Sequence, residues 1–407
     1  MLRIFLPPVG LDPAHRNLLL LLGAAFFVAQ YDMTVLSLAL PDLQASFGIN
    51  EQDVGKVIAA ARLGAFPAVF LALISDRIGR RRLLVLTLLG LSLATGATGF
   101  ARTTGEFIAL QFCARLFCTA EEILSVIYVL EVLPARHRGW GVGFLAAMGG
   151  LGSGMASLLY GLVDYLPGGW RALYVISAFP ILYLAWLRRL LPETALFEKS
   201  AGMIAGRSAL QPFLDIFRNH RREITAISLI AALFWFQVSA TLSFMSKYLQ
   251  EAHDYQPQQV SLLFIVAGSL AILGNVMAGR ISDRVGRKLT LVVALITYCA
   301  AIFTFYNSAG LLLPLAWIAA LFSFFAVDVL VNAVSGELFP THCRSTASTV
   351  RMIFAMFAAV SGLAIEGSLF NILGSHAAAL SLLCFSALLA VPVVILMLRE
   401  TANTELS

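Results

Sequence analysis

Twelve long apolar stretches follow one another through the 407 residues of this chain. A helix needs about 20 such residues to cross the hydrocarbon core of a bilayer. The chain is 59% hydrophobic and only 13% charged, whereas soluble domains carry about 25% charged residues. A soluble fold cannot bury that much apolar surface. The sequence therefore predicts an all-α membrane protein with twelve membrane-spanning helices embedded in the lipid bilayer.

The basic residues of the connections indicate how the chain is oriented. Most Lys and Arg residues lie in connections on one side, for example Arg81, Arg82, Arg284 and Lys288. Such residues are retained on the cytoplasmic side. With an even number of spans, we expect a multi-pass protein of the cytoplasmic membrane with both termini in the cytoplasm. The basic residues are spread along the chain, so no nucleic-acid partner is indicated.

Two sequence patterns occur twice with nearly the same spacing. SDRIGRR at residues 75–81 recurs as SDRVGRK at residues 282–288, and EVLPARHR at residues 131–138 recurs as ELFPTHCR at residues 337–344. Repetition of this kind indicates two duplicated six-helix halves.

The longest connection separates the two halves. We expect a first six-helix bundle at residues 1–191, a cytoplasmic linker at residues 192–222 and a second six-helix bundle at residues 223–407.

The repeated motifs carry a family resemblance. With DRxGRR after the second span, DRxGRK after the eighth and Pro192-Glu193-Thr194 after the sixth, the chain resembles the major facilitator superfamily of secondary transporters, nearest to its sugar-porter and organic-ion branch. The resemblance implies two pseudo-symmetric bundles, transport by alternating access and no cofactor or metal. Ala72 stands where the first motif usually opens with glycine. The fifth span lacks the Gly-Pro pair typical of drug/proton antiporters, which favours uptake.

The resemblance also implies that the repeated loops form a cytoplasmic gate. Glycine suits the tight reversals of these loops, and acids beside the arginines can hold neighbouring helices together. The alternative is that the charges only fix the topology. The candidate gating residues are Asp76, Arg77, Gly79, Arg80, Glu131, Arg138, Asp283, Arg284, Gly286, Arg287, Glu337 and Arg344.

Three ionisable residues lie at one depth inside the expected spans. At 1.5 Å per residue, Asp32, Arg62 and Arg115 are each roughly 12 Å below the outer ends of their helices. Such residues cost about 2.5–3.5 kcal/mol each on insertion scales, so each needs a partner or a purpose. Asp32 corresponds to Ser239 in the second half, which favours function over a shared packing role. The alternative is that Asp32 and Arg62 form a purely structural pair.

The fourth and tenth spans carry further acids. Glu122 lies on the same helical face as Arg115, while Glu121 lies off that face and is interpreted as a structural acid. We expect Asp32 and Glu122 to couple transport to protons. Arg351 and Glu366 are long enough to reach the headgroups from near the ends of their spans. The candidate substrate-binding residues are Gln30, Arg62, Arg115, Gln237, Asp328 and Asn332.

These residues favour a proton-coupled symporter of a small organic solute. Three arginines within spans, Arg62, Arg115 and Arg351, favour an organic anion. The alternatives are an exporter of drugs or lysolipid-like amphiphiles by proton antiport, or a uniporter. The chain contains no HExxH, GxSxG or phosphate-loop motif, so an enzyme is not expected. We expect the protein to function as a monomer.

Overall fold

The computed structural model describes residues 12–134, 137–190, 216–339 and 343–401, and within them the regular secondary structure is helical with no strand. Eleven helices of this described part are long and apolar enough to cross a membrane. A further helix, α6 (Thr104–Val132), has 29 residues and carries Arg115, Glu121 and Glu122 within its apolar sequence. Together they account for the twelve expected spans and confirm the all-α membrane fold.

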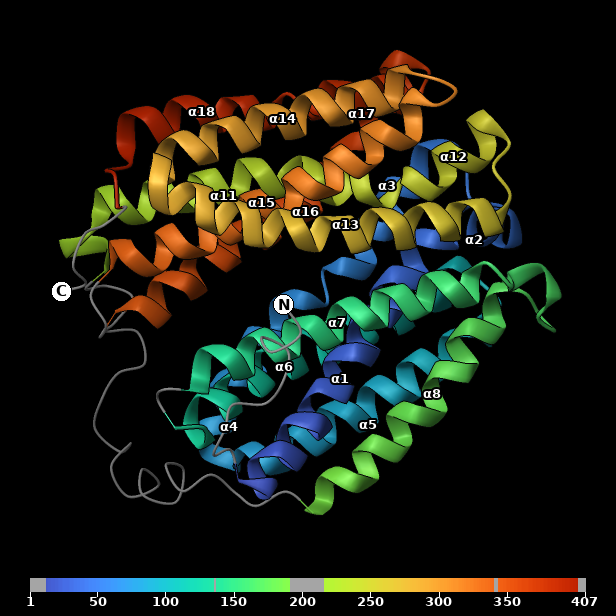
Figure 1. The fold of residues 1–407 in the computed structure, drawn as a ribbon. Coiled ribbons are helices and arrows are strands. Elements are labelled where there is room, and N and C mark those ends of the chain that lie inside the picture. Colours follow the sequence, from blue (N-terminus) through green and yellow to red (C-terminus); the bar gives the residue numbers. More distant parts are fainter. Residues whose placement is uncertain (1–11, 135–136, 191–215, 340–342, 402–407) are drawn as a thin grey trace. The chain divides into compact units, whose positions relative to one another are not determined.

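The described helices divide into two compact units, of which unit 1 comprises residues 1–48 and 60–206. Its first long helix packs against α7, and α5 packs against both α6 and α8 (Figure 1). Besides α6, the helices of unit 1 are α1 (Pro13–Leu38), α2 (Leu40–Phe47), α4 (Ala65–Ile78), α5 (Arg80–Thr98), α7 (Arg138–Tyr160) and α8 (Trp170–Leu187).

The second expected span is broken into two helices. The helix α3 (Glu51–Arg62) ends at Arg62, and two residues separate it from Ala65, where α4 begins. A Cβ atom on Gly64 would lie 2.0 Å from the carbonyl oxygen of Phe112 on α6, so only glycine fits at this crossing. The break leaves Arg62 at the last residue of α3, close to α6.

Unit 2 comprises residues 49–59 and 207–407, so it includes the first turns of α3. Its first long helix packs against α16, as α1 packs against α7 in unit 1, and α15 packs against α13 and α14 (Figure 1). The other helices of unit 2 are α11 (Arg221–Ser243), α12 (Met245–His253), α13 (Pro257–Val285), α14 (Arg287–Asn307), α15 (Leu312–Leu338), α16 (Arg344–Leu373), α17 (His376–Leu383) and α18 (Ser386–Met397).

The expected linker falls mostly on residues 191–215, which lie outside the described residues. The boundaries at 191 and 223 therefore stay a prediction.

Small buried residues bring the helices of unit 1 together near Asp32. Ala25 and Ala29 on α1 belong to one buried cluster with Ala114 and Cys118 on α6. The Cys118 thiol donates to the carbonyl oxygen of Ala29 at 3.7 Å. Because these side chains are short, α1 and α6 approach each other closely. Polar residues next to this contact on the two helices therefore lie close to each other.

Candidate functional site

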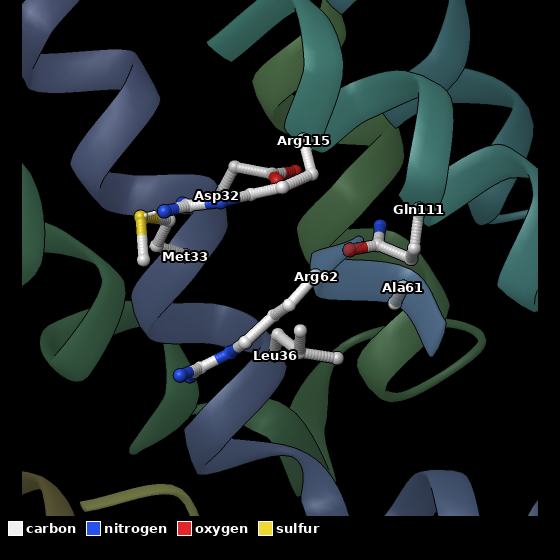
Figure 2. Close-up of a pocket in the computed structure, with 7 residues that line it drawn as sticks. All are labelled: Asp32, Met33, Leu36, Ala61, Arg62, Gln111 and Arg115. Carbon is white, nitrogen blue, oxygen red and sulfur yellow. Dashed lines mark hydrogen bonds between the residues drawn. The ribbon is translucent and has the colours of Figure 1, made fainter. Parts of the chain in front are cut away.

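A small pocket in unit 1 is lined by Asp32 from α1, Arg62 from α3 and Arg115 from α6 (Figure 2). These are the three ionisable residues that the sequence places at one depth. The remaining lining residues are Met33, Leu36, Ala61 and Gln111. The pocket therefore combines one carboxylate with two guanidinium groups.

Asp32 is buried, with 4% of its surface exposed. The Thr95 hydroxyl on α5 donates to its Oδ1 at 3.0 Å, and the charge of Arg115 acts on it. A carboxylate that is buried with a donor and a nearby cation is held in a defined position.

The guanidinium of Arg115 reaches Met33 on α1, where Nη1 contacts the sulfur atom (Figure 2). Its Nε is buried and has no hydrogen-bond partner among the described residues. The charge of Arg115 also acts on Arg62. Two positive charges in one pocket favour the binding of an anion. Guanidinium groups bind carboxylates in particular, through paired hydrogen bonds.

The two neighbouring acids of α6 have different surroundings. The Gln30 side chain donates to Glu122 Oε1 at 2.8 Å, and the charge of Arg115 acts on Glu122. Glu121 instead forms an ion pair with Arg188 at 2.5 Å, in which both side chains are fully buried. Gln30, Arg115 and Glu122 thus form a polar group next to Asp32, whereas Glu121 has the structural surroundings that the sequence predicts.

In unit 2, Asp328 and Asn332 lie one turn apart on α15. The Asn332 amide donates to Asp328 Oδ2 at 3.1 Å, and Arg351 Nη2 on α16 donates to Asn332 Oδ1 at 2.7 Å. Sequence reasoning left Arg351 out of the candidate site because the residue lies near the end of its span. The sequence feature that could have identified Arg351 as a site residue is its position within a span.

Gln237 on α11 is fully buried. The Thr241 hydroxyl lies 3.4 Å from its Oε1, and its Nε2 has no hydrogen-bond partner in the part of unit 2 that the structure describes. Gln237 also interacts with the hydroxyl of Tyr298, so it belongs to a buried polar group with Thr241 and Tyr298 within unit 2.

The two candidate gating loops are described to different extents. Gly79 and Gly286 have φ angles of 102° and 111°, which L side chains rarely adopt, as the predicted tight reversals require. Glu131 is half-buried and Arg284 is exposed. The side chains of Asp76, Arg77, Arg80, Arg138 and Arg344 lie outside the described residues.

Arg287 connects the second loop to α15. Its Nη2 lies 2.7 Å from Asp283 Oδ1 and 2.9 Å from Glu337 Oε1. Glu400, close to the end of the described chain, accepts hydrogen bonds from the backbone N–H groups of Arg287 and Lys288 at 2.8 and 3.2 Å. These contacts hold the loop, the start of α14 and the end of α15 together.

No group of three or more His, Cys, Asp or Glu residues within the described ranges is arranged to hold a metal ion.

Comparison with protein families gives one match that covers nearly the whole chain. The model of the Major Facilitator Superfamily matches residues 22–257 and again residues 227–407. Among curated relatives, a putative niacin/nicotinamide transporter from Bacillus subtilis is 26% identical, over 97% of this chain and 98% of its own length. A cis,cis-muconate transport protein from Acinetobacter baylyi is 27% identical, over 79% of this chain and 80% of its own.

Solved structures show the same fold at low identity. The xylose transporter XylE from E. coli in its inward-open conformation aligns with a TM-score of 0.77 at 17% identity, covering 96% of this chain and 98% of the other. The human organic anion transporter MFSD10 aligns with a TM-score of 0.70 at 18% identity, covering 94% of this chain and 100% of the other.

Proposed function

The chain belongs to the major facilitator superfamily, and from this premise we propose that it is a proton-coupled symporter of small organic anions. It is an integral membrane protein that transports small organic solutes, and it is not an enzyme. The proposal concerns the coupling ion, the charge of the solute and the direction of transport.

The charge balance around Arg115 is the observation that carries the proposal. Asp32 and Glu122 together balance Arg62 and Arg115 when all four groups are ionised. Uptake of one proton by either carboxyl leaves a positive charge, which an organic anion neutralises. Binding of the anion in turn favours uptake of the proton. A proton and an anion therefore bind more strongly together than either does alone.

The relatives support an organic acid as the solute. Their names give niacin or nicotinamide, cis,cis-muconate and sialic acid as what they transport. Niacin, muconate and sialic acid each carry a carboxylate, the group that the free Nε of Arg115 and its neighbours are suited to bind.

We assign the polar residues of unit 2 to the same task. Asp328, Asn332 and Gln237 supply hydrogen-bond donors and acceptors to the uncharged part of the solute, and Gln30 does so from unit 1. The buried polar surroundings of Gln237 support this assignment.

We place both termini in the cytoplasm of a protein that functions as a monomer in the cytoplasmic membrane. The two DRxGR loops then form its cytoplasmic gate. Within unit 2, the contact of Arg287 with Glu337 holds the second of these loops against the end of α15.

Uptake into proteoliposomes tests the proposal. The solutes are niacin, cis,cis-muconate and xylose, each offered with and without an imposed inward proton gradient. We expect the gradient to drive accumulation of one of the acids and not of xylose. Asp32→Asn abolishes accumulation and leaves solute exchange intact, because it removes the proton and keeps the shape of the side chain.

Asp53→Asn is the matched control. Asp53 forms an exposed ion pair with Lys56 on α3 and faces no group of the pocket. If uptake does not depend on the pH gradient, the protein is a uniporter and the symport proposal is wrong. If only amphiphiles move, and only out of loaded vesicles, the protein is an exporter.

A further inference from the structure

A second cluster of ionisable residues lies in unit 2, at the start of α17. His376 Nδ1 lies 2.5 Å from Glu366 Oε1 on α16, and His376 Nε2 lies 2.8 Å from Glu51 Oε2 on α3. We call these three residues the His376 cluster. Glu51 and His376 are far apart in the sequence, so the cluster connects the first turns of α3 to α16 and α17.

The geometry of the cluster suits one extra proton. A neutral imidazole has one N–H group and one lone pair, and an ionised carboxylate only accepts. Both ring nitrogens lie within hydrogen-bond distance of a carboxylate oxygen. With a neutral ring and two ionised acids, one of the two contacts would bring lone pairs together. Both contacts are attractive only when the ring is protonated or one carboxyl keeps its proton.

Because Glu366 is buried, its contacts depend strongly on whether the cluster holds a proton. The Glu366 side chain is fully buried, and its Oε2 has no hydrogen-bond partner among the described residues. The imidazole packs against the rings of Phe244 and Phe370, with centroids 4.9 and 4.3 Å away. A buried carboxylate that loses its partner is strongly unfavourable. The sequence-based expectation that Glu366 reaches the headgroups is wrong, because its side chain is fully buried and contacts His376.

The charges around the cluster are mostly negative. Lys247 on α12 lies 3.0 Å from Glu51 and also pairs with Glu251. From α14, Tyr306 faces Glu366. Glu51 and Glu251 therefore both pair with Lys247, whereas Glu366 pairs with His376, and a proton on the cluster reduces the negative charge at this place.

The same place is a close crossing between α3 and α16. A Cβ atom on Gly55 would lie 2.4 Å from the carbonyl oxygen of Leu363 and 2.9 Å from Glu366 Oε2. A Cβ atom on Gly367 would lie 2.4 Å from the carbonyl oxygen of Gln52. The two backbones therefore approach closely at these glycines, and the polar contacts of the His376 cluster lie beside the crossing.

We propose that the His376 cluster is a proton-binding site that fastens residues 49–59 to α16 and α17 when it is occupied. When the proton leaves, the imidazole keeps a single N–H group. Glu366 is the costlier partner to abandon because it is fully buried, so the contact with Glu51 is lost. Residues 49–59 keep the contact of Glu51 with Lys247, but they have one attachment fewer and detach more readily. The site goes beyond the proposed symport and depends on neither the solute nor Asp32.

Hydrogen exchange of residues 49–59 tests this inference in the whole protein in lipid nanodiscs. Exchange is followed by mass spectrometry between about pH 5 and pH 8, where histidines titrate, and each rate is divided by the intrinsic rate at that pH. We expect protection at the acidic end and an increase in exchange of about tenfold or more as the proton leaves, the size that the loss of one charge-assisted hydrogen bond gives.

Two variants separate a proton site from a packing contact, because they move the exchange in opposite directions. His376→Gln cannot hold the proton, so the segment exchanges fast at every pH. Glu366→Gln offers an amide N–H to a neutral imidazole, which then donates to Glu51, so the segment stays protected even at the alkaline end. Both variants remove the pH-dependent step.

Two controls keep the test independent of the proposed symport. Asp53→Asn, on the same helix and outside the cluster, retains the step of the unmodified protein. Asp32→Asn also retains it, whether or not Asp32 couples transport. The inference is overturned if the exchange of residues 49–59 in the unmodified protein, divided by the intrinsic rate, does not depend on pH. It is also overturned if the pH-dependent increase in exchange persists in both His376→Gln and Glu366→Gln.

Discussion

Glu121 and Arg188 form an ion pair in which both side chains are fully buried, with 2.5 Å between Oε1 and Nη1. Thr87 and Ser125 donate further hydrogen bonds to the same carboxylate, each at 2.8 Å. The next residue, Glu122, accepts from Gln30 instead. Two adjacent acids on one helix therefore belong to two different environments, one structural and one next to the pocket.

Glu121→Gln should destabilise the protein. The substitution leaves the Arg188 guanidinium buried without a counter-charge, and breaking a buried pair in this way costs on the order of 3–5 kcal/mol. We expect a clearly lower midpoint of thermal unfolding in detergent. Glu122→Gln is the matched variant one residue away and should unfold close to the unmodified protein. Equal losses of stability in the two variants would contradict the assignment of their roles.

Arg115→Gln should weaken binding of the transported anion. The glutamine keeps hydrogen-bonding atoms but removes the charge, and hydrogen bonds to charged groups contribute about 1.5–3 kcal/mol. That range corresponds to a loss of affinity of about ten- to a hundredfold. Arg115→Lys should recover part of it, because lysine restores the charge without the planar fork. The measurement is the dissociation constant in detergent by calorimetry, and unchanged affinity in Arg115→Gln would exclude this residue from the site.

Asp42, in the short helix α2 outside the spans, should make stability depend on pH. Burial raises the pKa of this carboxyl above its ordinary value, the hydrogen bond from Tyr160 opposes that rise, and Asp164 adds to it. A raised pKa in the folded state gives stability that is fully present below the unfolded pKa and is lost as pH rises through the folded pKa.

We therefore expect the unfolding midpoint to fall as pH rises from about 4, the range in which aspartates titrate. Asp42→Asn should reduce this fall and stabilise the protein at neutral pH, whereas Asp53→Asn should leave the profile unchanged. The measurement is thermal unfolding as a function of pH. A profile of Asp42→Asn that matches the unmodified protein would show that the carboxyl does not contribute.

Glu337→Gln should change how fast the transporter cycles and leave solute affinity unchanged. The variant removes the charge that holds Arg287 to α15 at 2.9 Å. If this contact closes the gate, the variant alters the maximum rate of exchange while the dissociation constant stays the same. Arg280→Gln, at an exposed position of α13, is the control. A change in affinity with no change in rate would remove Glu337 from the gate.

The sequence predicts the helices and the grouping of the three ionisable pocket residues. The hydropathy of each span follows from the bilayer as solvent, and the rise of 1.5 Å per residue places Asp32, Arg62 and Arg115 at one level. The break between α3 and α4 was not predicted. It depends on the contact between Gly64 and the Phe112 carbonyl, which lies on another helix.

The partners of residues at the ends of spans could not be predicted. Glu51, Glu366 and His376 each occupy a place where polar residues are common, so none of them draws attention alone. Their chemistry arises from proximity in space between residues far apart in the sequence. The same is true of Arg351, whose partner Asn332 lies on the preceding helix.

The most direct test of the central claim is proton movement driven by the solute. Proteoliposomes with a pH-sensitive dye inside are given an inward gradient of the transported organic acid and no pH gradient. The proposed symport predicts that the lumen becomes more acidic with the unmodified protein and stays at its starting pH with Asp32→Asn, although Asp32→Asn still exchanges the acid. Entry of the acid through the unmodified protein with no change in lumenal pH would contradict it.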